Sequence, residues 1–211
     1  MEQNQTSPDD FLRNLNNQIK LVGGLGLCVL VPDGATLQSR RLLLTTHPAW
    51  ADHIAHFVQS HFSPMMEPEP FHPTIHSVRL QPGVTGHHGW LQTGIAAVGI
   101  VSHVLPGGRS IDVLVPALRE LHRDDLAAIS RLIHGAWYGL KHYVFRPLSG
   151  ITPQQGKVLE LALEGHSVKE TAEAMALTER TVNHHLTQLQ ARLNTSGKTQ
   201  SIVKAIWLGA L

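Results

Sequence analysis

The sequence predicts an α+β protein: an N-terminal α/β/α sandwich with an antiparallel sheet, followed by an all-α four-helix domain. In the first 145 residues, apolar runs and a hairpin pattern predict strands, and the amphipathic segments around them predict helices. This order is expected of a sheet covered by helices. After residue 150 every periodic segment has helical spacing, and FRPLSG at 145–150 interrupts the pattern. We therefore expect one domain over 1–146, a linker over 147–150 and a second domain over 151–211.

Capping residues and hydrophobic spacing place the elements of the first domain. Ser7 can cap a helix that begins at Pro8, because serine accepts a hydrogen bond at a helix start and proline fits the first turn. Gly23 and Gly24 end this helix. The elements expected after it are strands at 25–32 and 40–46, a helix at 48–62, a mostly loop segment at 63–90, a hairpin of 94–105 and 110–116 around the turn PGGR, and a long helix at 121–143.

Four helices are expected in the second domain, and residues suited to helix N-termini precede three of them. Such residues accept hydrogen bonds from the free amides of a first turn. The predicted helices are a segment that starts at Thr152 and stops at Gly165, a segment at 167–176 with a capping box of Ser167 and Glu170, a segment at 179–193 opened by Thr178, and a last segment at 199–211.

The second and third of these helices are separated only by 176–178. So short a link forces a sharp crossing, which is the geometry of a helix-turn-helix that sets its second helix into the major groove of DNA. Apolar residues on the inner faces form the expected core between the helices: Ala172, Met175, Leu177, Val182, Leu186 and Leu189. The alternative is a plain four-helix domain that binds a protein.

The outer face of the third helix carries uncharged groups suited to hydrogen bonding with base edges, namely Asn183, His184, Thr187 and Gln188. Residues suited to phosphate contacts, which position a domain without specifying sequence, are Lys169, Thr178, Arg180, Thr181, Arg192 and Lys198. The net charge of the chain is only +1. DNA binding would therefore depend on local arrangement and on dimerisation rather than on bulk charge.

This region resembles the DNA-binding domain of the LuxR-type regulators over nearly all of 151–211. The resemblance is carried by Val158, Leu159, Leu161, Ala162, Gly165, Ser167, Lys169, Glu170, Ala172, Thr181, Val182, His185, Leu193, Thr199, Gln200, Ala205 and Gly209. It implies that Asn183, His184 and Thr187 face the bases and that the last helix is a dimer contact. The sequence departs from the family where Gln155 and Lys157 replace acidic residues, where Asn183 replaces a common lysine and where Lys198 replaces arginine.

The first domain is similar to the autoinducer-binding domain of LuxR-type regulators, which senses acyl-homoserine lactones. The similar stretches are HPAW at 47–50, SP at 63–64 and GIVSHVLPGGR at 99–109. The resemblance implies ligand contacts at Trp50, Ile54 and Ser63. Ile54 stands where the family has tyrosine and Ser63 where it has aspartate, so two polar anchors for a lactone are lost. Trp50 also fits the apolar face of an amphipathic helix.

We therefore predict a DNA-binding transcription regulator of the quorum-sensing type whose degenerate pocket needs no ligand. One alternative is a receptor for an acyl-homoserine lactone or another small apolar signal molecule. A second is an interaction module that pairs with another LuxR-type regulator and inhibits it. The expected partners are double-stranded DNA and a second copy of this chain.

Composition excludes other classes. The apolar fraction of 42% indicates a globular chain, and no sequence feature predicts a signal peptide, a membrane span or membrane binding. With Cys28 as the single cysteine, we expect a cytoplasmic protein. The 15 histidines have no known ligand spacing, so we expect neither a metal nor a cofactor. Neither a nucleophile with its base nor a phosphate loop opening a helix is found, so an enzyme is not expected.

Overall fold

The computed structural model describes residues 7–32, 39–62, 75–105 and 109–211. The chain divides into two compact units, 1–137 and 138–211, which are described separately. The predicted Ser63 and most of the predicted turn at 106–109 lie outside the described residues. In the described part, no helix is both long enough and apolar enough to cross a membrane.

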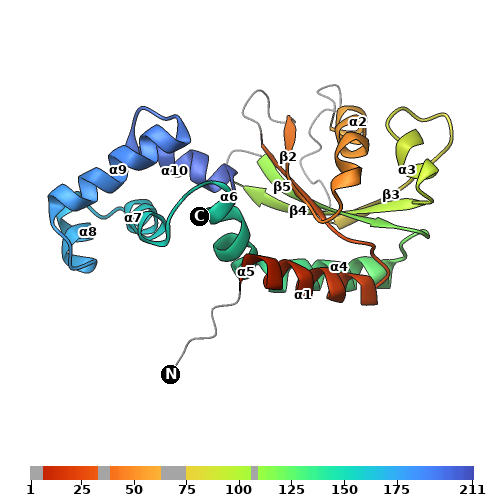
Figure 1. Cartoon of the computed structure of the whole chain (residues 1–211), viewed down its shortest axis with the longest axis horizontal. Helices are drawn as coiled ribbons and strands as arrows, with labels where there is room; N and C mark the ends of the chain where they lie inside the picture. The colour runs from red at the N-terminus through yellow and green to blue at the C-terminus, as the bar shows by residue number, and fades with distance from the viewer. Residues whose placement is uncertain (1–6, 33–38, 63–74, 106–108) are drawn as a thin grey trace. The chain divides into compact units, whose positions relative to one another are not determined.

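The first unit is built on one antiparallel sheet in the order β2-β1-β5-β4-β3. The strands are β1 (Cys28–Pro32), β2 (Arg40–Thr45), β3 (Ile75–Arg79), β4 (Ala97–Leu105) and β5 (Arg109–Ala117). Helices α1 (Pro8–Leu21) and α4 (Arg123–Gly135) cover one face, and α2 (Ala51–His61) and α3 (His88–Gln92) lie on the other (Figure 1). A short helical turn, η1 (Pro48–Trp50), leads into α2. The predicted α/β/α sandwich is confirmed.

Successive residues of the strands supply two cores, because side chains alternate between the faces of a sheet. Leu30, Leu114 and Ile100 pack in a buried cluster with residues of α2 and α3. On the other face a Cβ atom at Gly99 would lie 2.9 Å from Leu121, so glycine allows the chain that leads into α4 to approach the sheet closely.

One ion pair is buried at the sheet. The Arg40 Nε donates to Asp112 at 2.7 Å, and the side chains are only 7% and 1% exposed. Ser110 donates to the same carboxylate. This hydrogen-bonded arrangement compensates the cost of removing the Asp112 charge from water.

One expectation for the first domain is incomplete and another is wrong. The segment 63–90, predicted to be mostly loop, contains strand β3 and the start of α3 in its described part. The predicted long helix at 121–143 is broken: α4 ends at Gly135, and α5 (Trp137–Gly139), a π-helical stretch, η2 (Leu140–Phe145), and α6 (Arg146–Leu148) follow. The last two of these belong to the second unit.

The second unit contains α7 (Pro153–Leu163), α8 (Val168–Ala174), α9 (Glu179–Leu193) and α10 (Lys198–Trp207). The predicted caps are confirmed: the hydroxyls of Thr152, Ser167 and Thr178 each accept from the amide three residues later. Thr152 and Ser167 head capping boxes, so side chains satisfy the free donors at those helix starts.

Arg146 ties the start of the second unit to its helices. The side chain is 6% exposed and donates to the Ala210 carbonyl at 2.8 Å, to Glu160 and to His142 Nδ1. Burial raises the pKa of Glu160, but the hydrogen bond and charge of Arg146 outweigh it and leave that pKa below its usual value. The residues just before 147–150 therefore pack with the second unit, and the boundary at 147–150 stays a prediction.

Candidate nucleic-acid interface

The turn between α8 and α9 is short and fixed by its backbone. Ala176 adopts φ of 53°, a left-handed conformation that reverses the chain after α8. The amide of Leu177 then donates to the Ala172 carbonyl at 2.9 Å. Thr178 takes up the extended conformation of an N-cap and starts α9. The two helices are thereby held in a helix-turn-helix, as the three-residue spacing predicts.

A small apolar core holds α9 in place. Val158 of α7, Ala172 of α8, and Val182 and Leu186 of α9 are buried together, with Met175 and Leu177 partly buried against them. Leu189 is also fully buried. All of these except Val158 were predicted for the core. The inner face of α9 is therefore fixed by packing, and its outer face is left to solvent.

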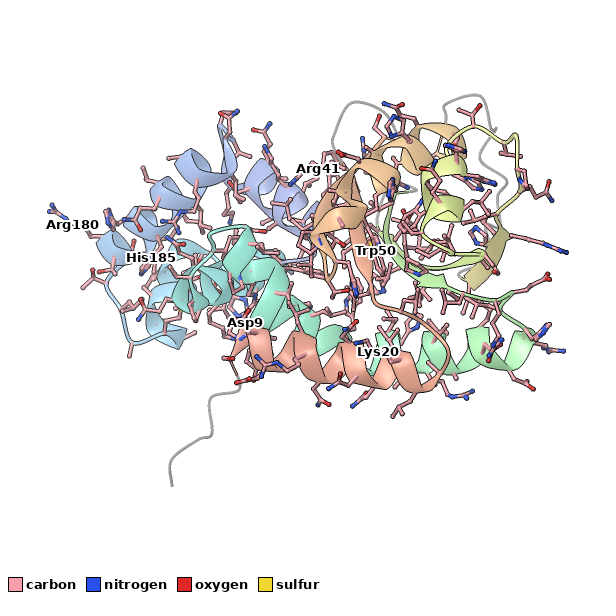
Figure 2. The ribbon with its side chains drawn as sticks, turned by 45° about the vertical axis from the view of Figure 1, so that its right-hand side comes forward. Asp9, Lys20, Arg41, Trp50, Arg180 and His185 are labelled. Atoms are coloured by element: carbon pink, nitrogen blue, oxygen red, sulfur yellow. The ribbon has the colours of Figure 1, made fainter. Side chains whose placement is uncertain are left out.

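Most of the predicted DNA contacts lie on the outer face of α9 or at its start, and Lys169 lies on α8. Arg180 extends from the start of α9 away from the ribbon (Figure 2). Lys169, Thr178, Arg180, Asn183, His184 and Thr187 are exposed, and Thr181 is half-buried. The structure thus brings these seven residues to the surface of one helix-turn-helix. Of the other three predicted contacts, Gln188 and Arg192 are exposed on α9, and Lys198 is half-buried at the start of α10.

Local hydrogen bonds orient several of these side chains. The Thr178 and Thr181 hydroxyls lie 2.8 Å apart, so the cap also fixes Thr181. The Thr187 hydroxyl donates to the Asn183 carbonyl at 3.0 Å and so remains able to accept a hydrogen bond. Gln188 Nε2 and His184 Nε2 lie 3.0 Å apart. The face is therefore partly preorganised before any ligand binds.

Gln155 is a residue that the predicted set does not include. It is 2% exposed, and its Nε2 donates to Gln188 Oε1 at 3.1 Å, which links α7 to α9. Its place three residues after the cap Thr152 could have predicted the capping box. The contact across 33 residues of sequence could not be predicted from spacing.

Residues 149–205 match the family model described as bacterial regulatory proteins, luxR family. The C-terminal unit carries a LuxR-type helix-turn-helix domain. LuxR of Aliivibrio fischeri is 41% identical over 61 residues, which are 29% of this chain and 24% of that protein. GerE of Bacillus subtilis, a spore germination protein, is 28% identical over 71 residues, 34% of this chain and 93% of GerE.

With some other proteins, the region of similarity extends beyond this domain. The transcriptional regulatory protein DegU of Brevibacillus brevis is 28% identical over 131 residues, 58% of this chain and 53% of DegU. The chain thus spans about half of DegU and a quarter of LuxR. The solved structure of SdiA in complex with octanoyl-rac-glycerol superposes with a TM-score of 0.51 at 17% identity, covering 98% of this chain and 90% of SdiA. This likeness shows a shared fold.

The two described residues of the predicted ligand site lie in the core of the first unit. Trp50 is 6% exposed and Ile54 is 1% exposed. The Trp50 ring stacks on His47 at 4.0 Å between centroids and lies 5.7 Å from the ring of Trp90. Trp50 and Ile54 thus share one buried cluster with Phe57 and Trp90, and their contacts are those of packed core side chains.

Several histidines lie near this core. His61 stacks on Phe57 at 4.3 Å, and its ring lies 5.5 Å from that of His87. Burial, together with the neighbouring His87 and His76, lowers the pKa of His61 to about 4. In the described part of the chain, no three His, Cys, Asp or Glu residues are arranged to hold a metal ion.

Proposed function

We propose that this protein is a transcription regulator that binds specific duplex DNA through its LuxR-type domain. The observation that carries the proposal is the exposed polar face of α9 above a buried apolar core. An α-helix fits the major groove of B-DNA, where each base pair presents a distinct pattern of donors and acceptors. A surface of amides, hydroxyls and an imidazole is suited to that pattern.

The residues of the domain have different roles in this proposal. Asn183, His184 and Thr187 contact base edges and specify the sequence. The two cations, Lys169 and Arg180, contact phosphates and fix the position of the domain on the duplex. Thr178 and Thr181, at the positive end of the α9 dipole, add hydrogen bonds to a phosphate.

We further propose that the protein binds DNA as a homodimer through α10. A single domain has few cations for phosphate contacts, so two domains on two half-sites are needed for tight binding. Val203 of α10 is 39% exposed, which supports an apolar contact there. Another LuxR-type regulator could bind the same surface instead of a second copy. Analytical ultracentrifugation of this protein mixed with such a regulator would distinguish the two cases, because only pairing with the other regulator gives mixed dimers.

The proposed regulator acts without an acyl-homoserine lactone. This part rests on the packing of Trp50 and Ile54 in the core and on serine and isoleucine at two positions where the family has polar anchors. A buried ligand amide without its partner costs about 1–3 kcal/mol, which is roughly 5- to 150-fold in affinity.

One observation favours a second candidate, a small apolar ligand that carries a hydrogen-bond acceptor. The Trp90 Nε1 is buried and has no hydrogen-bond partner among the described residues. Buried donors are usually paired, and the SdiA structure of the same fold contains octanoyl-rac-glycerol. Isothermal titration with 1-octanoyl-glycerol, on the wild type and on Trp90→Phe, tests this candidate. Heat that disappears in the variant would support it.

Selection from a random duplex library tests the proposed DNA binding. We expect the full chain to enrich one motif with two half-sites. Asn183→Ala should relax the preference at one base pair, with a loss of about 1–3 kcal/mol there. Lys169→Ala should instead weaken binding to all duplexes alike and reduce the salt slope by about one unit. No enrichment over random competitor at low salt would refute the proposal.

A further inference from the structure

A continuous hydrogen-bonded chain runs from the start of α7 to the exposed face of α9. The Thr152 amide donates to Gln155 Oε1 at 3.1 Å, and Gln155 Nε2 donates to Gln188 Oε1 at 3.1 Å. The Gln188 Nε2 then lies 3.0 Å from His184 Nε2. Two amide side chains thus connect a backbone N–H to a residue that our proposal places against the bases.

The direction of every bond in this chain follows from its first member. A backbone N–H can only donate, so the group facing Thr152 must be the Gln155 oxygen. The Arg192 guanidinium, 3.4 Å from the same oxygen, requires the same orientation. The Gln155 NH₂ therefore faces Gln188 and needs an acceptor there. The Gln188 oxygen is that acceptor, so the NH₂ group of Gln188 is directed at His184.

A donor facing His184 Nε2 requires that nitrogen to be an unprotonated acceptor. The ring proton of a neutral imidazole then lies on Nδ1. An imidazolium, or the tautomer with its proton on Nε2, would place two donors against each other. Rotating the Gln188 amide does not help, because it would set two NH₂ groups together at Gln155.

We propose that Gln155 and Gln188 are positioning residues that hold His184 as the Nδ1-protonated tautomer, so that it contacts DNA as a hydrogen-bond donor. In the major groove such a donor pairs with an acceptor, the N7 or O6 of guanine, the N7 of adenine or the O4 of thymine. The inference rests on the proposed function for the role of α9. It further specifies that His184 prefers acceptor groups on the bases and that Gln155 and Gln188 determine this preference.

Substitution of Gln155 by glutamate reverses the chain with almost no change of shape. A carboxylate still accepts from the Thr152 amide and lies beside Arg192, which favours its charged form. It has no proton to donate to Gln188, so the Gln188 amide rotates and presents its oxygen to His184. The imidazole then carries its proton on Nε2, and Nδ1 becomes an acceptor that favours the amino groups of adenine or cytosine.

The first test measures the tautomer in the absence of DNA. The full chain, with ¹⁵N-labelled histidine, is observed by NMR at about pH 8, above the usual pKa of histidine, and the His184 resonances are assigned by their loss in His184→Asn. We expect an unprotonated Nε2 in the wild type and in Gln154→Glu. Gln155→Glu should give a protonated Nε2, the form that a solvated histidine prefers. A wild type with protonated Nε2 would overturn the proposal.

The second test measures base preference by duplex selection with the same variants. Gln154 is an exposed neighbour outside the chain of hydrogen bonds, so Gln154→Glu controls for the added negative charge. We expect Gln155→Glu alone to change the preferred base at one position by about tenfold, and Gln188→Ala to flatten the preference there. A thermal melt confirms that each variant is folded.

The outcomes separate this inference from the proposed function. If the wild type enriches no motif, DNA reading by α9 is wrong, while the NMR result still decides the tautomer. If the wild type enriches a motif and Gln155→Glu selects the same bases as Gln154→Glu, the positioning role of Gln155 is refuted.

Discussion

The two units place their predicted contact residues in opposite surroundings. In the first unit Trp50 and Ile54 are almost fully buried in an aromatic and aliphatic cluster. In the second, Asn183, His184 and Thr187 are exposed on one helix whose other side is buried. Substitution of a buried residue therefore changes mainly the stability of the fold. Substitution of an exposed polar residue on a rigid helix changes stability little and affects mainly the contact with a partner.

The largest expected effect follows from the buried side of this comparison. Trp50→Ala should lower the free energy of unfolding of the first unit by about 3–5 kcal/mol, because it removes a large core side chain. Trp50→Phe keeps an aromatic ring and should cost less than about 1.5 kcal/mol. Urea unfolding followed by circular dichroism measures both. A loss below about 1 kcal/mol for Trp50→Ala would contradict a packed core at this position.

The second prediction tests whether the units are stabilised independently. Ser167→Ala removes the cap of α8 and should cost about 1 kcal/mol in the unfolding of the second unit. Ser7→Ala removes the cap of α1 and should cost a similar amount in the first unit. Hydrogen exchange, resolved by peptide, assigns each loss to a unit. Equal loss of protection in both units for either variant would show that they unfold together.

The third prediction concerns the stability of the first unit in acid. His61 takes up a proton near pH 6.5 when unfolded but only near pH 4 when folded. The unfolded chain therefore binds more protons between these values, so the stability of the first unit should fall as the pH drops from 6.5 to 4. His61→Gln should reduce this slope in thermal melts recorded across the range. An unchanged slope would show that His61 does not contribute.

Local chemistry explains what the sequence could predict. Caps and turns depend on neighbouring residues, so Ser7, Thr152, Ser167 and Thr178 identify helix starts that the structure confirms. The helix-turn-helix core was predictable for the same reason, because its apolar residues lie within two adjacent helices. The comparison with known proteins supports the same domain.

Features that depend on distant contacts were missed. Strand β3 has the sequence IHSVR, and its polar and charged residues do not give the apolar pattern by which strands are predicted. It forms at the edge of the sheet by pairing with β4. The break after α4 has no proline to indicate it. The link from Gln155 to Gln188 joins residues on two helices. For β3 and for the link from Gln155 to Gln188, pairing or contact across the fold, rather than local propensity, decides the conformation.

The central claim is that the LuxR-type domain binds a specific duplex without a lactone, and one titration tests it most directly. The full chain is purified from a host that makes no lactone and titrated by fluorescence anisotropy onto its selected duplex and a scrambled duplex at one salt concentration. We predict at least about 10³-fold preference for the selected duplex, unchanged when acyl-homoserine lactones of short to long chain are added. Specific binding that arises only after a lactone is added, or equal affinity for both duplexes, would contradict the claim.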